Sequence, residues 1–312
     1  MVNKLNLKIE KVLKEQSDCY LCGGSDLTTR RESVRYEIPK IVYECNYCKL
    51  VYLFPLEDNS STSDFYRQGF RDLPRQSIGM SSHDTKTIMN TRMDQAYRRL
   101  KKVKPYVNKN TKLLEVGCAA GSFIKAIKPL VRECFAVELD SENADFVRKK
   151  LNIEVFEKPI ENLNSDKYDI ICMWHVLEHV NDPIKVVKKL MSMLNKNGVL
   201  FIEVPNIFDP LLTLYKLEEF HKFYYQSPHL YYFSPTTLEK IIHRAGYKPI
   251  IHNIQIYGIM NHLRWLIKKK PQKFQEKKQS GFNIFGGFYR ILLKTFNKTD
   301  TLFAIIKKTN KN

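Results

Sequence analysis

Residues 112–123 read KLLEVGCAAGSF, in which a short apolar run leads into a cluster of very small residues. The run KLLEV is typical of a short buried strand, and an apolar stripe at helical spacing follows the small residues as far as Val131. Small residues between a strand and a helix allow a ligand to approach the main chain closely. Ligands of open parallel sheets lie at the carboxyl ends of the strands, so this loop predicts a ligand site.

Strand-like and helix-like segments alternate after this loop. The runs CFAVEL (134–139), YDIICMW (168–174), VLFIEVP (199–205) and DTLFAIIKK (300–308) are typical of buried strands. Asp182-Pro183 and Ser234-Pro235 are pairs that begin helices, and Asn197-Gly198 is expected to end the helix that starts at Pro183. This alternation predicts an α/β fold with a doubly wound, Rossmann-like and mostly parallel sheet, covered by helices on both faces.

The spacing of the small residues indicates the kind of ligand. Glu115, Gly117, Ala119 and Gly121 form E-x-G-x-A-x-G, which differs from the G-x-G-x-x-G of dinucleotide-binding loops. Glu138 follows the next strand, where a carboxylate is placed to accept both hydroxyls of a ribose. A tight turn that merely packs a helix on a sheet is the alternative, but the second carboxylate favours a cofactor site.

With these motifs the sequence resembles the class I S-adenosylmethionine-dependent methyltransferases. The likeness covers about residues 90–260 and the final strand, and it includes KYDIICMWHVLEHVNDP, KNGVLFIEVPN and HLYYFSPTTLEKIIHRAGYK. It implies a seven-stranded sheet, S-adenosyl-L-methionine as cofactor and methyl transfer as the activity. The cofactor-binding residues that it implies are Glu115, Gly117, Cys118, Ala119, Gly121, Ser122, Phe123, Glu138, Leu139, Ile160, Glu161, Met173, Trp174 and His175. Ala119 stands where a glycine is commoner.

Two cysteine pairs precede this region. Cys19-x-x-Cys22 and Cys45-x-x-Cys48 are separated by 22 residues, and each pair can place both sulfurs on one tetrahedral ion. Four protein ligands leave no open position, so we expect a structural Zn²⁺ rather than a catalytic one. Free thiols in a small domain are the alternative. The other three cysteines lie in the loop and strands and are expected to be small core residues.

The branch of the family with an N-terminal cysteine module includes sugar C-methyltransferases, whose corresponding segment carries Tyr-His-Glu-His. This sequence has Gln226, Ser227, Pro228 and His229 there, so only the last histidine is kept. The change makes C-methylation doubtful and favours an oxygen nucleophile. His229 is the leading candidate for a general base, and His175 is expected to point towards cofactor or substrate.

The segment HVLEH, residues 175–179, formally matches a zinc-peptidase pattern. That pattern needs both histidines on one face of a helix. Here the first histidine follows directly on the strand-like run YDIICMW. We therefore do not expect a peptidase site.

Domain boundaries follow from composition. Residues 1–56 are expected to form a zinc-ribbon module, residues 57–87 a polar linker or mobile cover, and residues 88–312 the methyltransferase domain.

The net charge of +18 is unevenly distributed along the chain. From His262 onward there are 13 Lys and Arg residues but only two acidic ones, Glu276 and Asp300. Residues 262–299 mix these charges with aromatic side chains, which predicts either peripheral contact with an anionic membrane surface or a solvated insertion before the last strand.

The leading function is methylation of a small-molecule acceptor, namely a saccharide, a nucleotide-sugar or a lipid-linked compound. An RNA or protein methyltransferase and a non-enzymatic zinc-ribbon binding protein are the alternatives. The run MWHVLEH argues against amine methylation of nucleic acid, and the charge is concentrated in one late segment, so a nucleic-acid partner is not expected. A charged N-terminus, seven cysteines and no long apolar run predict a cytoplasmic protein, and membrane contact by residues 262–299 would make it peripheral to the inner face of a membrane. The oligomeric state stays open.

Overall fold

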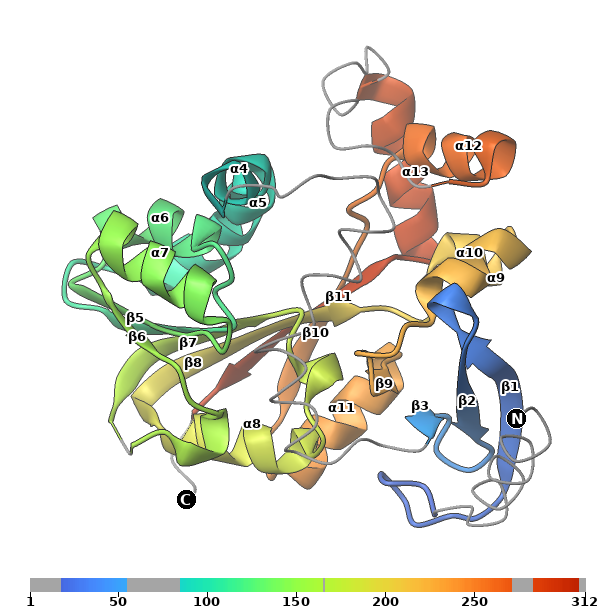
Figure 1. Ribbon diagram of the computed structural model, residues 1–312, viewed down its shortest axis with the longest axis horizontal. Coiled ribbons are helices and arrows are strands. Elements are labelled where there is room, and N and C mark those ends of the chain that lie inside the picture. Colours follow the sequence, from blue (N-terminus) through green and yellow to red (C-terminus); the bar gives the residue numbers. More distant parts are fainter. Residues whose placement is uncertain (1–17, 55–84, 165, 271–282, 309–312) are drawn as a thin grey trace, which may run out of the picture.

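A computed structural model describes residues 18–54, 85–164, 166–270 and 283–308 of the chain. Two sheets form within these residues (Figure 1). The larger contains β4 (Lys112–Val116), β5 (Glu133–Val137), β6 (Glu154–Phe156), β7 (Tyr168–Trp174), β8 (Leu194–Pro205), β10 (Pro249–Ile254) and β11 (Thr301–Lys307). The smaller contains β1 (Leu27–Val34), β2 (Ile38–Cys45), β3 (Val51–Phe54) and β9 (Tyr231–Tyr232).

The large sheet has the order β10-β11-β8-β7-β4-β5-β6. Its strands β6, β5, β4, β7 and β8 are parallel, whereas β11 runs antiparallel to both β8 and β10. The expected seven-stranded and mostly parallel sheet is thereby confirmed. The chain adds β5 and β6 on one side of β4 and then crosses to β7 on the other side. The loops after β4 and β7 therefore meet where the strand order reverses, which is where such sheets bind ligands.

Helices cover both faces of this sheet (Figure 1). On one face, α5 (Met93–Val103), α6 (Ser122–Ile127) and α7 (Ser141–Leu151) enclose a core that includes Phe123, Val147 and Phe201. On the other face, α8 (Pro183–Ser192) and α11 (Pro235–Arg244) pack on the sheet through residues such as Leu190 and Leu238. Asp182 and Ser234 cap α8 and α11 by accepting hydrogen bonds from main-chain N–H groups, as expected.

The remaining α-helices of the described residues lie near the carboxyl ends of the parallel strands (Figure 1). They are α4 (Thr85–Thr91), α9 (Pro210–Thr213), α10 (Glu218–Tyr224), α12 (Ile259–Lys268) and α13 (Asn283–Thr295). The rings of Phe220 and Trp265 join α10 to α12, with centroids 5.0 Å apart. A hydrogen bond between the His262 ring and the Tyr289 hydroxyl joins α12 to α13.

The small sheet does not consist of the N-terminal segment alone. Its fourth strand, β9, comes from the region before α11, and Val51 and Tyr52 of β3 pair with Tyr232 and Tyr231. The Leu53 N–H also donates to the Leu230 carbonyl at 2.9 Å. The N-terminal segment therefore supports the tyrosine-rich segment, residues 219–234, which precedes α11.

The end of α8 differs from the expected one. The helix ends at Ser192, and Leu194, expected on its apolar face, begins β8 instead. Between β7 and β8 the pairing shifts from Tyr168–Leu194 to Ile170–Val199, so the Asn197-Gly198 pair turns inside the strand. A Cβ on Gly198 would lie 3.0 Å from the Asn195 carbonyl oxygen, which explains the glycine without a helix end.

The predicted bounds of one strand, of the linker and of the insertion can also be compared with the structure. The run CFAVEL forms a strand only as far as Val137. Most of the predicted linker, residues 57–87, lies outside the described residues, and residues 85–87 begin α4. The predicted insertion, residues 262–299, contains the end of α12 and all of α13, while residues 271–282 lie outside the described part.

Candidate active site and four-cysteine cluster

The loop after β4 has the backbone that its small residues predict. Gly117, Ala119 and Gly121 all have positive φ angles, of 72°, 47° and 76°. A Cβ on Gly117 would lie 2.4 Å from Val176 Cγ2, so the close approach of the loop after β7 requires glycine there. At Gly121 a Cβ would lie 2.9 Å from a methyl group of Val147 on α7. Both glycines are therefore required by packing as well as by backbone conformation.

Glu138 lies across this loop. One carboxylate oxygen accepts a hydrogen bond from the Ala119 N–H at 2.7 Å, and the other accepts one from the Asp140 N–H at 2.9 Å. Burial raises the pKa of Glu138, and these two main-chain hydrogen bonds oppose the rise. The structure thus brings the second predicted carboxylate to the glycine loop. A role of Glu138 in holding a ribose stays a prediction.

Glu115 lies beneath the loop at the end of β4 and is 2% exposed. Burial raises its pKa to about 8, with Glu138 adding to the rise and Arg99 opposing it. Burial raises the pKa of the thiols of Cys118, Cys134 and Cys172, and the nearby Glu115 carboxylate adds to this rise. Its Oε2 has no hydrogen-bond partner among the described residues.

The other residues predicted to bind the cofactor are partly buried in the hydrophobic cores and partly accessible to solvent. Five have side chains that are 7% exposed or less and belong to the hydrophobic cores, namely Cys118, Phe123, Ile160, Met173 and Trp174. Ser122 is 8% exposed, and its hydroxyl donates to the Met89 carbonyl of α4 at 2.9 Å. Leu139 is half-buried and Glu161 is exposed. Their contacts with a cofactor stay predictions.

A buried ion-pair cluster that the sequence did not predict lies beside this site. Glu203 of β8 is fully buried, and Arg98 and Arg99 of α5 each make two hydrogen bonds to its carboxylate at 2.7–3.0 Å. Although burial alone would raise the pKa of Glu203, contacts with His175 and the two arginines hold it well below its ordinary value. A glutamate inside the apolar run VLFIEVP was the available signal, since buried carboxylates need partners.

His175 lies at the end of β7, between two carboxylates. Its φ is 56°, and its ring nitrogens lie 3.4 Å from Glu178 Oε1 and 3.3 Å from Glu203 Oε1. Burial alone would lower the pKa of His175, but the two carboxylates outweigh it and raise the pKa to about 9. The predicted residue is therefore at the strand exit, and its raised pKa favours the positively charged ring at neutral pH.

The segment HVLEH does not lie on one helix face. Leu177–His179 form a single turn of 3-10 helix, and the His179 ring packs against the ring of His229 with centroids 4.6 Å apart. Glu178, His179 and His229 bring potential ligand atoms within 4.8 Å of one another. Sequence reasoning singled out His229 but missed this grouping, because the two segments are 50 residues apart and only the fold joins them. Burial, followed by the effect of His179, lowers the pKa of His229 well below its ordinary value.

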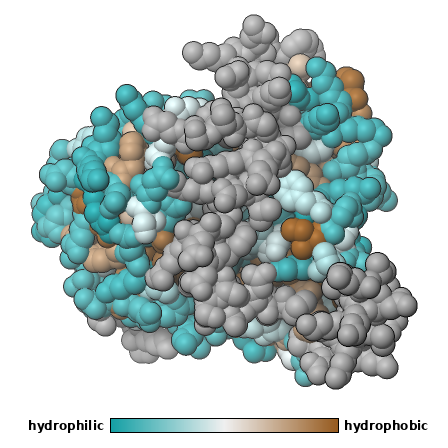
Figure 2. Space-filling view, viewed as in Figure 1, coloured by the Kyte–Doolittle hydropathy of each residue, from teal (hydrophilic) through white to brown (hydrophobic). Residues whose placement is uncertain are grey.

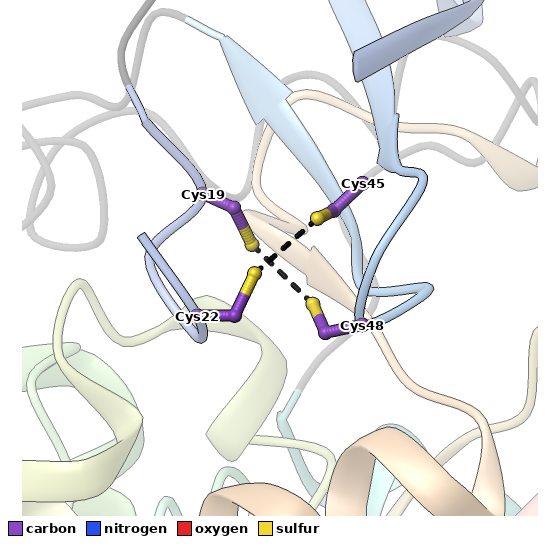
Figure 3. Close-up of side chains that lie close together, drawn as sticks. All are labelled: Cys19, Cys22, Cys45 and Cys48. Carbon is purple, nitrogen blue, oxygen red and sulfur yellow. Dashed lines mark hydrogen bonds between the residues drawn. The ribbon is translucent and has the colours of Figure 1, made fainter. Parts of the chain in front are cut away.

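Figure 3 shows the four cysteines beside the small sheet, with their sulfurs pointing towards one another. Cys19 Sγ lies 3.4 Å from Cys48 Sγ, and Cys22 Sγ lies 3.4 Å from Cys45 Sγ. All four are free thiols rather than disulfides. The contact from the Cys48 thiol lowers the pKa of Cys19 to about 5, against the effect of burial.

These cysteines fit a structural zinc ion. A tetrahedral site with Zn–S bonds of about 2.3 Å separates its sulfurs by roughly 3.8 Å, close to the spacing found. The Gly24 N–H approaches Cys22 Sγ at 3.4 Å, and Gly23 has a φ of 73°, which together form the tight turn that the first pair needs. The donor set is four sulfurs with no open position. Such an ion would stabilise the fold and take no part in chemistry.

Comparisons with known proteins agree with this architecture. Residues 87–252 match the family described as "Methyltransferase domain". The match covers more than half of the chain, and the chain belongs to this family. Its sheet order and glycine loop are those of a class I S-adenosylmethionine-dependent methyltransferase, which confirms the resemblance found in the sequence.

The individual relatives are distant. A "Ubiquinone biosynthesis O-methyltransferase" of Actinobacillus pleuropneumoniae serotype 7 (strain AP76) is 28% identical over 107 residues, which are 30% of this chain and 46% of that protein. The protein of the same name from Pelagibacter ubique (strain HTCC1062) is 31% identical over 104 residues, 31% of this chain and 43% of that protein. The chain thus spans less than half the length of these curated relatives.

Among solved structures, a SAM-dependent methyltransferase from Archaeoglobus fulgidus superposes with a TM-score of 0.50 and 17% identity. The superposition covers 77% of this chain and 100% of that chain. At this identity the likeness shows the fold alone. The four cysteines lie outside the residues that match the family.

Proposed function

We propose that the protein transfers a methyl group from S-adenosylmethionine to an oxygen of a small-molecule acceptor, such as a saccharide, a nucleotide-sugar or a lipid-linked compound. The observation that carries the donor side is the Glu138 carboxylate hydrogen-bonded to Ala119 of the glycine loop. Membership of the methyltransferase domain family supports the same reading. The names of the relatives, which are O-methyltransferases, support oxygen as the nucleophile.

On the donor side, we assign residues 117–123 to the methionine part of the cofactor and Glu138 to its ribose. Each Glu138 oxygen uses one lone pair on the main chain, so each retains capacity for a ribose hydroxyl. When bound, S-adenosylmethionine supplies an activated methyl group on its sulfonium. The protein then has to hold donor and acceptor in line and exclude water.

On the acceptor side, we assign His175 and His229 to the surroundings of the reacting hydroxyl. His175 directly follows β7, and His229 lies against residues 178–179, just beyond the same strand end. The sheet order reverses at this place. The Leu230 N–H donates to the Glu178 carbonyl at 2.8 Å, which holds His229 opposite residues 178–179. The replacement of Tyr-His-Glu by Gln226, Ser227 and Pro228 supports O-methylation over C-methylation.

We assign the four cysteines to a structural Zn²⁺ in a module of residues 1–56, attached to a methyltransferase domain of residues 88–312. The Tyr20 hydroxyl donates to the Asp182 carboxylate and accepts from the Ile184 N–H at 3.0 Å, so the module also contacts the start of α8. Together with the pairing of β3 and β9, these contacts make the module a support for the segment that carries His229.

For the helices near the C-terminus, we propose peripheral contact with an anionic membrane surface. Phe288, Ile291 and Leu292 lie on one face of α13 and are 67%, 64% and 42% exposed, and Ile267 of α12 is 76% exposed. Figure 2 shows hydrophobic residues at the surface where α12 lies, at the upper right. Apolar side chains beside lysines are typical of helices that lie on anionic lipid. None of the helices in the described part of the chain is long and apolar enough to cross a bilayer.

Vesicle co-sedimentation at low salt tests this surface. Anionic vesicles should bind the wild-type protein, and Phe288→Ser with Ile291→Ser should weaken the binding. Tyr47→Ser is the control, because Tyr47 is 69% exposed but lies in the cysteine module. Equal sedimentation of all three proteins, or none with wild type, would contradict the proposal.

The transfer itself is tested with labelled S-adenosylmethionine and panels of saccharide, nucleotide-sugar and lipid-linked acceptors. Label in an alkali-stable methyl ether supports the proposal. Label bound to carbon would overturn the preference for oxygen. Nuclease-sensitive label in co-purified RNA would show the RNA methyltransferase alternative instead.

A further inference from the structure

The turn between β1 and β2 contacts the end of α10 through Arg35. The Arg35 Nε–H donates a hydrogen bond to the Phe223 carbonyl at 2.6 Å, and the Arg35 main-chain N–H donates one to the Tyr225 carbonyl at 2.8 Å. The Arg35 guanidinium also lies over the Phe223 ring, 3.7 Å from its centroid. Basic side chains stabilise the carbonyls that a helix leaves open at its end, and α10 ends at Tyr224. The cysteine module therefore holds the chain where α10 ends.

This turn is shaped for its contact with α10 rather than for an ion pair. Burial lowers the pKa of Arg35, and no carboxylate in the described part of the chain forms an ion pair with it. Tyr36 and Glu37, the next two residues, have positive φ angles of 68° and 55°. Such angles are unfavourable for residues with a side chain, and they persist where the surroundings fix the backbone for a purpose. Both features indicate that the turn has a role beyond joining two strands.

The cysteine module holds the chain a second time only a few residues later. There β9 pairs with β3. Residues 226–230 thus lie between two attachments to the same module, the turn at Arg35 on one side and β3 on the other. Because both ends of this short segment are fixed, it can adopt fewer conformations than a free loop.

Contacts inside the segment extend the restraint to His229. The Tyr225 ring packs edge to face on the Tyr232 ring, with centroids 4.9 Å apart. The Tyr232 hydroxyl accepts a hydrogen bond from the Gln226 N–H at 2.8 Å. The His229 N–H donates to the Gln226 carbonyl at 3.0 Å, and the Gln226 side-chain amide lies 2.7 Å from His229 Nε2. A shift of Tyr225 therefore moves the groups that orient the His229 ring.

We propose that Arg35 is a positioning residue for the acceptor side of the active site, because it fixes residues 225–230 and thereby sets the place of His229. Arg35 acts through the carbonyls of Phe223 and Tyr225 and not by contact with the reacting atoms. Its effect on methyl transfer rests on the proposed function, in which His229 lies near the reacting hydroxyl. The four cysteines and the pairing of β3 with β9 do not depend on Arg35, so its effect is separable from that of zinc.

Amide hydrogen exchange of the zinc-loaded, full-length protein tests the restraint without any acceptor. Arg35→Met keeps an unbranched stem but removes the guanidinium. Exchange at the Gln226 and His229 amides should accelerate by about 10- to 100-fold, because a hydrogen bond from a charged donor is lost. Exchange at the Cys45 amide, which donates to the Leu50 carbonyl within the module, should stay within about twofold, since the two regions open independently.

Arg31→Met is the matched control. It removes the same charge from β1, and its partner Glu218 also belongs to α10, but the Glu218 side chain is 61% exposed. An exposed ion pair contributes little to stability, so exchange at the two reporting amides should stay as in the wild-type protein. Arg35→Lys keeps the charge and one donor, and it should recover part of the protection.

Steady-state kinetics separates positioning from a general loss of structure. With an acceptor identified in the panels above, Arg35→Met should lower kcat/KM for that acceptor by about tenfold, and Arg35→Lys should restore part of it. The affinity for S-adenosylmethionine should stay within about twofold, because the glycine loop lies in other elements. An equal loss of cofactor affinity in Arg35→Met would show a structural role and overturn the proposal.

Circular dichroism identifies a variant that fails to fold. If Arg35→Met does so, Phe223→Leu, which removes only the ring beneath the guanidinium, carries the exchange test. Unchanged exchange at the Gln226 and His229 amides in the folded variant, or equal acceleration in Arg31→Met, would overturn the proposal. A wild-type protein that transfers no methyl group would contradict the proposed function, whereas the exchange test of Arg35 would still decide.

Discussion

Leu230 and Glu178 are joined by a main-chain hydrogen bond of 2.8 Å, although 52 residues separate them in the chain. This bond attaches the tyrosine-rich segment to the exit of β7. The same segment forms β9, which pairs with β3 of the cysteine module. The cysteine module and the candidate acceptor site are therefore connected through β9, a strand of two residues.

Loss of the zinc ion should destabilise the fold. We expect Cys48→Ser to abolish stoichiometric zinc and to lower stability by about 3 kcal/mol, because metal binding contributes directly to folding. Metal analysis and thermal unfolding measure both effects. Cys134→Ala is the control, since Cys134 is a buried cysteine of β5 outside the cluster and should leave one zinc per chain. Full zinc content in Cys48→Ser would contradict the assignment of the ligands.

Gly117 should tolerate no side chain. Gly117→Ala places a Cβ 2.4 Å from Val176 at a φ of 72°, so the loop must move. We expect a loss of stability of about 1–3 kcal/mol and at least tenfold weaker S-adenosylmethionine binding. Gly286→Ala, with nothing within 4 Å of the added Cβ near the start of α13, is the control and should be neutral or slightly stabilising. Unchanged cofactor affinity in Gly117→Ala would show that the loop does not hold the cofactor.

The Glu203 cluster should be a major contribution to stability. Glu203→Gln leaves Arg98 and Arg99 without their buried counter-charge, and we expect a loss of about 3–5 kcal/mol in urea unfolding. Glu133→Gln breaks a pair of similar length with Arg132, but both side chains are about half exposed, so the change should stay below about 1 kcal/mol. Equal effects of the two substitutions would contradict this account.

Glu115 should make stability depend on pH. Its pKa is raised by burial to about 8 in the folded protein, against an ordinary value of 4.5. The folded state therefore binds the proton more tightly, and the contribution of Glu115 to the free energy of unfolding falls as pH rises from about 4.5 to about 8.

Glu115→Gln cannot ionise and should lose this dependence. Relative to the variant, the wild-type protein should lose about 3.5 kcal/mol of stability between pH 5 and pH 8. Urea unfolding at both pH values measures the difference, with exposed Glu154→Gln as the control. A constant difference between wild type and Glu115→Gln at both pH values would show that the pKa is not raised.

Local patterns were enough to predict the glycine loop, the cysteine pairs and the parallel strands. The glycine loop is recognisable from the small residues between a strand and a helix, and the Cys-x-x-Cys spacing is a property of one turn. The side chains that crowd Gly117 and Gly121, namely Val176 and Val147, come from later segments and were not predicted. The end of α8 was predicted wrongly, because Asn197-Gly198 serves a shift of register between β7 and β8 rather than a helix end.

The acceptor side depends on contacts between distant segments. Nothing in the sequence around Glu203 shows that Arg98 and Arg99 will reach it, since these residues are about 100 positions earlier. His229 was noticed by comparison with a family, whereas its contact with His179 exists only in the folded chain, where Leu230 is hydrogen-bonded to Glu178. Such groupings follow from topology and not from composition.

Isothermal titration of S-adenosylmethionine into the zinc-loaded protein tests the central claim most directly. We expect one site per chain in the wild-type protein, and at least tenfold weaker binding in Glu138→Ala, because the variant loses the carboxylate that lies across the glycine loop. Glu154→Gln should bind as wild type does. No heat of binding with millimolar cofactor, or the same affinity in Glu138→Ala, would contradict the account.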